Sequence, residues 1–261
     1  MITSLAATDF TQRAEAILAL MREERSKNGI KAAMDAVAEK FIDMEPHPQL
    51  RRLGEVLGLA RQQAMVQVGL DGDREALHHG NLSHEQNIAT GHHYEMLRHA
   101  ACTYNHLLRG LIESSSEFIS RDNLMDWLSA VSGGRKDWVK GEITGAVSEI
   151  ALHAALQGLP ELKNMRYGSV GEDLVGYDFV GEWQGQVLTV DAKSGLYAPL
   201  SEIKHGHRHL EISVPREAVN GLAVNHRGLV LLRREVRQAL LSDSGAQMHA
   251  PHHYFQPAFN I

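Results

Sequence analysis

The sequence predicts a mixed α/β protein in which a helical first half precedes a smaller, strand-containing second half. Up to about residue 119 the chain reads as one helix after another, with few β-branched runs. After a glycine-containing turn at residues 132–134, one long helix leads into a hairpin and further strand-like segments. A helix that leads into a hairpin and strands indicates an α/β or α+β arrangement and not a helical bundle.

The first half is expected to be helical throughout. Ala14, Ile17, Leu18 and Met21 recur at three- and four-residue spacing, which predicts one apolar stripe along a helix. Polar stretches at 71–73 and 78–83 are expected to separate helices. The helices are expected over residues 10–26, 30–42, 47–68 and 82–118.

The second half is expected to begin at the turn, which divides the chain into residues 1–132 and 133–261. In the second part a helix is expected over 138–156 and another over 233–241, and strands over 177–183, 186–193, 209–214 and 228–232.

Composition narrows the protein class. The 261 residues carry a formal net charge of −6, which argues against a protein coated with positive charge but leaves room for a local basic groove. No apolar run approaches the roughly 18 residues that a membrane helix requires, so no membrane span is expected. The first residues lack a basic leader with an apolar stretch, and Cys102 is the single cysteine, so we expect a cytoplasmic protein without disulfides.

The hairpin at 177–193 concentrates the chemistry. Gln184-Gly185 is expected to form its tight turn, because glycine readily adopts the positive φ that such turns need. With this turn, Asp178 stands directly opposite Asp191. Side chains so paired have Cβ atoms about 4.5–5.5 Å apart, and two bare carboxylates at that distance repel unless a cation or a proton lies between them.

These residue types suit a metal ion and a phosphate. Lys193 follows Asp191 by two residues and therefore points to the same side of the strand. Hard divalent ions such as Mg²⁺ take carboxylate oxygens and phosphate oxygens. A bound ion can activate water, and an ammonium can stabilise the charge that develops on a phosphate.

Asp178, twelve intervening residues and then Asp191-Ala192-Lys193 resemble the PD-(D/E)XK nuclease superfamily, in the second half of the chain only. The resemblance implies a restriction-endonuclease-like core, a central mixed sheet flanked by helices. It implies that Asp178 and Asp191 bind Mg²⁺ or Mn²⁺, that Lys193 assists catalysis, and that DNA is the substrate of a restriction, defence or DNA-processing enzyme. Tyr177 stands where the nominal proline would be.

In that superfamily an acidic residue on the preceding helix often completes the site. Glu142, Glu149 and His153 lie within about 40° of one another on a helical wheel, at the rim of the apolar face. Glu149 is the preferred further metal ligand and catalytic residue, and Glu142 is the substitute.

Several alternatives stay open. The same fold could be an inactive module that binds nucleic acid or protein, or an RNA-directed nuclease. His205, His207 and His209 could instead organise a zinc site, with a polar loop as the simpler reading. A homodimer is a reasonable expectation for an enzyme that cuts both strands, and the helical half is expected to recognise a partner or the substrate. Basic clusters that could hold a nucleic-acid backbone lie at 51–52, 135–136, 227, 233–234 and 237, and Arg208 or His207 could contact a phosphate.

Overall fold

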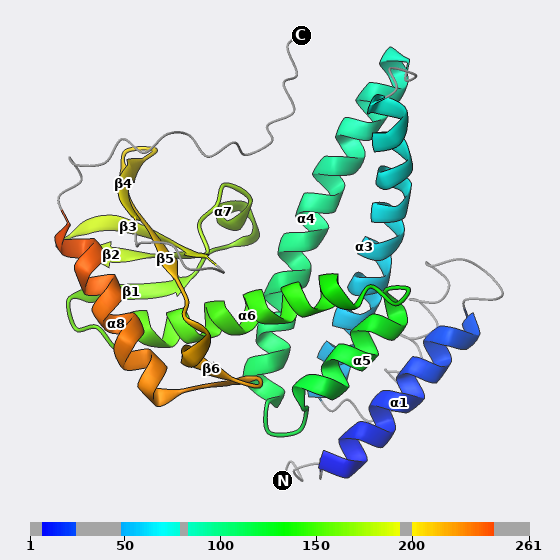
Figure 1. Cartoon of the computed structure of the whole chain (residues 1–261), viewed down its shortest axis with the longest axis horizontal. Helices are drawn as coiled ribbons and strands as arrows, with labels where there is room; N and C mark the ends of the chain where they lie inside the picture. The colour runs from blue at the N-terminus through cyan, green and yellow to red at the C-terminus, as the bar shows by residue number, and fades with distance from the viewer. Residues whose placement is uncertain (1–6, 25–47, 79–82, 194–199, 243–261) are drawn as a thin grey trace.

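The computed structural model describes residues 7–24, 48–78, 83–193 and 200–242 (Figure 1). Its first half consists of helices α1 (Ala7–Glu24), α3 (Pro48–His78), α4 (His84–Ser115) and α5 (Arg121–Val131). Long helices α3 and α4 lie side by side, and α1 and α5 pack near one end of this pair. Their shared core is apolar and fully buried; its members include Phe10, Leu53, Leu57, Tyr104, Leu108 and Leu128.

The predicted helices at 10–26, 47–68 and 82–118 are therefore confirmed with shifted ends, whereas 30–42 lies outside the described residues. The separator expected at 71–73 was wrong, because α3 continues to His78. The Asp and Gly residues at 71–73 are weak helix formers, but local propensity is a weak guide that tertiary context overrides, and α3 lies along α4. Helix α5 was not anticipated; Ser120 caps it by accepting a hydrogen bond from the Asn123 N–H at 3.1 Å.

Helix α6 (Lys136–Gln157) joins the two halves. Its first turns, with Val139, Ile143 and Val147, pack in the core of the helical region. Its last turns, with Leu152 and Leu156, pack under the sheet. Because one helix serves both cores, the division between 1–132 and 133–261 stays a prediction.

The second half holds a five-stranded mixed sheet in the order β1-β2-β3-β5-β4 (Figure 1). Strands β3 and β5 are parallel and all other neighbours are antiparallel. The strands are β1 (Leu162–Tyr167), β2 (Phe179–Trp183), β3 (Gln186–Lys193), β4 (Leu200–Lys204) and β5 (His207–Ser213). The mixed α/β class is thus confirmed.

One face of this sheet is apolar and packs against α6 and α8 (His226–Leu241). Every second residue of the central strands contributes to it, as a half-buried strand requires. Its buried members are Phe179, Leu188, Val190, Leu210 and Ile212. The opposite face therefore receives Asp178, Asp191 and Lys193.

The strand expected at 228–232 was wrong, because those residues lie in α8. A short apolar run alone does not distinguish a strand from a buried helix segment. The residues that follow the run do distinguish the two. The buried residues of α8 recur at helical spacing, and Val230 is exposed; the buried ones are Leu232, Val236, Ala239 and Leu240. Strands β1 and β4 and the short helix α7 (Val170–Leu174) were not anticipated. A small hairpin, β6 (Val219–Asn220) and β7 (Ala223–Val224), precedes α8.

Among the described residues, no helix combines the length and the apolar character that crossing a membrane requires.

Candidate functional site at the end of the hairpin

The β2–β3 hairpin has the predicted register. Phe179 pairs with Val190 and Trp183 with Gln186, and the turn residues Gln184 and Gly185 have φ values of 52° and 76°. Positive φ at both positions is the geometry of a two-residue type I′ turn, whose twist matches that of the strands. Asp178 precedes the first pair, so it meets Asp191 across the hairpin as expected.

Asp178 is half-buried and lies near the acidic side chains of Glu149 and Asp191. Its Oδ2 accepts a hydrogen bond of 2.7 Å from the Ala192 N–H. Burial, and then the nearby charges of Glu149 and Asp191, raise the pKa of Asp178 to about 9. The site therefore favours a positive charge where the two carboxyl groups meet, and a divalent cation could supply it.

Lys193 lies against Asp191, as the strand alternation predicts. Its ammonium forms an ion pair with Asp191 Oδ2 and lies 3.9 Å from Glu211 Oε1 on the neighbouring strand β5. Asp191 is buried, whereas Lys193 is half-buried. One cationic group thus sits between two acidic side chains of adjacent parallel strands.

Glu149 reaches this region from α6. Its negative charge is one cause of the raised pKa of Asp178, which puts the two carboxyl groups within electrostatic reach. Glu149 is also paired with Arg109 of α4, and the two side chains are only 13% and 4% exposed. Burial raises the pKa of Glu149, and the guanidinium of Arg109 opposes that rise. Glu142, the substitute, is half-buried near Glu149, and desolvation and then the charge of Glu149 raise its pKa to about 7.

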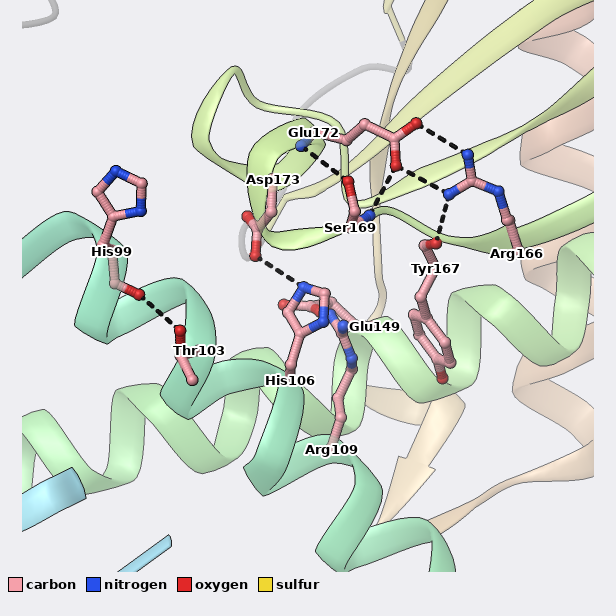
Figure 2. Close-up of polar contacts among 10 residues, drawn as sticks. All are labelled: His99, Thr103, His106, Arg109, Glu149, Arg166, Tyr167, Ser169, Glu172 and Asp173. Atoms are coloured by element: carbon pink, nitrogen blue, oxygen red, sulfur yellow. Dashed lines mark hydrogen bonds and ion pairs between the residues drawn. The ribbon is translucent and has the colours of Figure 1, made fainter. Parts of the chain in front are cut away.

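Helix α4 contributes a polar stripe that the sequence analysis missed. Cys102, His106, Arg109 and Glu113 follow one another at spacings of four, three and four residues, which places them on one helix face. His106 Nε2 lies 3.4 Å from Asp173 Oδ2, and Arg109 pairs with Glu149 (Figure 2). The same spacing rule that found the stripe at 14–21 would have found this one.

Glu113 and Cys102, the other two members of this stripe on α4, also lie close to residues of the second half. Glu113 accepts a 2.7 Å hydrogen bond from the Tyr167 hydroxyl. Burial, and then Asp173, raise the pKa of the Cys102 thiol to about 11, so it stays protonated. The helical region therefore lines one side of the acidic site.

Asp173 is held in place by the tightly organised helix α7 (Figure 2). Ser169 and Glu172 form a reciprocal capping box, with hydrogen bonds of 3.3 and 2.7 Å. Arg166 adds two bonds of 2.8 Å to the Glu172 carboxylate. These contacts fix the helix that places Asp173 beside α4.

The three histidines of the expected zinc site have different surroundings. His205 Nδ1 is hydrogen-bonded to the Tyr177 hydroxyl at 2.5 Å, and His207 is exposed. His209 is fully buried beside Thr189, and burial lowers its pKa to about 4. His209 lies with Asp191 and Glu211, whose potential ligand atoms are within 4.8 Å of one another. Within the described residues, His205 and His207 are not part of this group.

Most of the basic residues singled out in the sequence are engaged within the protein. Arg52 donates to the Gly110 carbonyl at 2.8 Å, and Arg237 pairs with Glu161 at 2.5 Å. Arg208 lies over the Trp183 ring at 4.6 Å and donates to the Ser242 carbonyl at 2.8 Å. Each of these three side chains joins two separate segments of the chain.

Comparisons with protein-family models, with curated proteins and with solved structures find no match to this chain.

Proposed function

We propose that the chain is a metal-dependent nuclease that hydrolyses phosphodiester bonds, and that DNA is its substrate. The observation that carries the proposal is the meeting of Asp178 and Asp191 across the hairpin, with the Lys193 ammonium against Asp191. Two carboxylates placed face to face repel, so the arrangement costs free energy unless a cation or a proton lies between them.

The fold supports a restriction-endonuclease-like core. A mixed sheet carries the acidic pair, and helices α6 and α8 pack on its apolar face. Glu149 stands on the helix that precedes the sheet, where the resemblance to PD-(D/E)XK nucleases expects a further acidic residue. The site therefore combines the expected residue types on the expected elements.

The donor set fits Mg²⁺ or Mn²⁺. Asp178 and Asp191 would hold the ion, with Glu149 as the further ligand, and carboxylate oxygens are the ligands that these ions prefer. Burial first, and then the charges of Glu149 and Asp191, raise the pKa of Asp178, and a divalent cation bound there would offset the repulsion among these carboxylates. When bound, such an ion lowers the cost of attack by water on the phosphorus atom.

The protein's own residues have separable tasks in this reaction. The Lys193 ammonium, held by Asp191 and close to Glu211, would contact a non-bridging phosphate oxygen and stabilise its developing charge. Arg109 would position Glu149 without contacting the substrate, because its guanidinium is already paired with that carboxylate. The helical region would then act in recognition and also as part of the wall of the site.

DNA is proposed because the resemblance is to a superfamily that acts mostly on DNA, in restriction, defence or DNA processing. An RNA-directed nuclease and an inactive binding module remain the alternatives. A homodimer is also a proposal, since cutting both strands of a duplex requires two active sites or two successive cuts.

The proposal is tested by cleavage of supercoiled plasmid, linear duplex DNA, single-stranded DNA and RNA in Mg²⁺ or Mn²⁺. We expect cleavage by the wild-type chain and its loss in Asp191→Ala and Lys193→Ala, with the fold retained by circular dichroism. Lys163→Ala is the matched control, because Glu161-Leu162-Lys163 has the same acidic-x-Lys pattern and Lys163 is an exposed residue of β1.

The substrates separate the alternatives. Cleavage of RNA alone would identify the RNA-directed nuclease. Binding without cleavage of any substrate would favour the inactive module. Cleavage that both substitutions leave unchanged would reject the proposed site.

A further inference from the structure

We infer that Asp191, His209 and Glu211 form a further binding site, for a transition-metal ion such as Zn²⁺. The three side chains come from the adjacent parallel strands β3 and β5, where Asp191 is the direct partner of Glu211. The inference goes beyond the proposed nuclease activity. It shares Asp191 with the proposed nuclease site but does not require the chain to be a nuclease.

The geometry brings one nitrogen and two oxygen ligands together. A ring nitrogen of His209 and carboxylate oxygens of Asp191 and Glu211 all lie within 4.8 Å of one another. Two ligands of one zinc ion are separated by no more than about 4.2 Å, given Zn–N and Zn–O distances near 2.1 Å. A small side-chain adjustment would therefore let one ion contact all three groups.

His209 supplies an independent observation that points to a ligand. The residue is 0% exposed, and its Nε2 has no hydrogen-bond partner among the described residues. A buried polar atom without a partner destabilises the fold, so its presence needs an explanation. A metal ion bound by Nε2 provides one.

The hydrogen bond at the other ring nitrogen of His209 leaves Nε2 able to bind a metal ion. Its Nδ1 lies 2.9 Å from the Thr189 hydroxyl, which also has a longer bond of 3.4 Å to the Arg208 carbonyl. If the single hydroxyl proton goes to the carbonyl, Thr189 accepts from Nδ1–H, and Nε2 retains a lone pair. Metal-binding histidines are commonly oriented in this way by a partner on the other ring nitrogen.

Charge and donor type favour a divalent transition metal here. The two carboxylates carry two negative charges, and the Lys193 ammonium already occupies a position between them, 3.9 Å from Glu211 and paired with Asp191. The single positive charge of the ammonium balances one of these carboxylates, whereas a divalent ion would balance both. An imidazole nitrogen suits zinc and its neighbours and not Mg²⁺, which prefers oxygen ligands.

The test is calorimetric titration of the metal-free full chain with Zn²⁺, with visible absorption of bound Co²⁺ as a second readout. We expect one tight site in the wild type, weakened by at least about 100-fold in His209→Ala, because even changes next to a metal ligand cost 10–100-fold. Glu211→Gln, which keeps the side-chain shape, should weaken binding in the same way and covers the case in which His209→Ala fails to fold. His207→Ala is the matched control, an exposed histidine on the same strand, and should bind as the wild type does.

Asp178→Asn separates this inference from the nuclease proposal. It should keep the tight Zn²⁺ site whatever it does to cleavage. Loss of the site in Asp178→Asn would assign the ion to the hairpin pair and overturn the inference. So would a wild type without a tight site, or binding that neither His209→Ala nor Glu211→Gln weakens.

Discussion

Arg109 of α4 and Glu149 of α6 form a buried ion pair beside the Asp178–Asp191 hairpin. Arg109 also lies over the Tyr167 ring of β1, 4.2 Å from its centre. One side chain of the helical region thus touches both the helix and the sheet that frame the acidic site. The candidate site is therefore built by both halves of the chain.

Removing Arg109 should destabilise the protein. Arg109→Ala leaves Glu149 buried without its partner, and breaking such a pair typically costs about 3–5 kcal/mol. Urea unfolding followed by circular dichroism measures this change. Glu149→Gln, added to Arg109→Ala, should recover part of the loss because the unpaired charge is gone.

The exposed pair Arg166–Glu172 is the control for that measurement. Arg166→Ala should cost about 1 kcal/mol or less, because pairs open to solvent contribute little. Equal losses for Arg109→Ala and Arg166→Ala would show that burial of the Arg109 pair does not matter.

Stability should depend on pH through Asp178. Its pKa is about 9 in the folded protein and 3.8 as an unperturbed side chain, so the folded state binds this proton more tightly than the unfolded state. Between about pH 4 and pH 9, rising pH therefore removes stability, by at most about 1.4 kcal/mol per pH unit for one group. Asp178→Asn removes this titration.

The comparison is made by thermal unfolding in EDTA from pH 5 to pH 8. We expect the melting temperature of Asp178→Asn to rise relative to that of the wild type as the pH increases. A constant difference across this range would mean that Asp178 is not the titrating group. Addition of Mn²⁺ at pH 8 should stabilise the wild type more than Asp178→Asn.

The hairpin turn offers a local test of the register. Gln184 has a φ of 52°, a conformation that asparagine adopts more easily than glutamine, and Asn-Gly is the preferred pair for this turn. Gln184→Asn should stabilise the protein by about 0.5 kcal/mol in chemical denaturation. The same change at Gln186, which lies in β3, should be neutral or destabilising because asparagine is disfavoured in strands. A stabilisation at both positions would argue against the turn as its cause.

The hairpin and its acidic pair could be predicted from the sequence because their geometry is local. A Gln-Gly turn fixes the register, and the register alone places Asp178 opposite Asp191. Glu149 could be placed at the rim of α6 from helical periodicity alone. Each of these inferences needed only residues close together in the chain.

The rest depends on contacts between distant segments. The approach of α4 to α7 joins His106 to Asp173, and no pattern within either segment specifies that pairing. Likewise, the parallel pairing of β3 with β5 puts Glu211 beside Asp191, although the β5 sequence itself was expected to be a strand. Residues 228–232 were assigned to a strand because four consecutive apolar residues conceal the helical spacing of α8.

The most direct test of the central claim is single-turnover cleavage of duplex DNA in Mn²⁺ by Asp178→Asn. The change replaces one carboxylate oxygen by an amide nitrogen and keeps the side-chain shape. Glu182→Gln, the same kind of change farther along β2, is the control and should cleave as the wild type does. We predict that Asp178→Asn lowers the cleavage rate by at least about 100-fold while the fold stays intact. A rate within about twofold of the wild type would contradict the claim that the Asp178–Asp191 pair is the catalytic metal site of a nuclease.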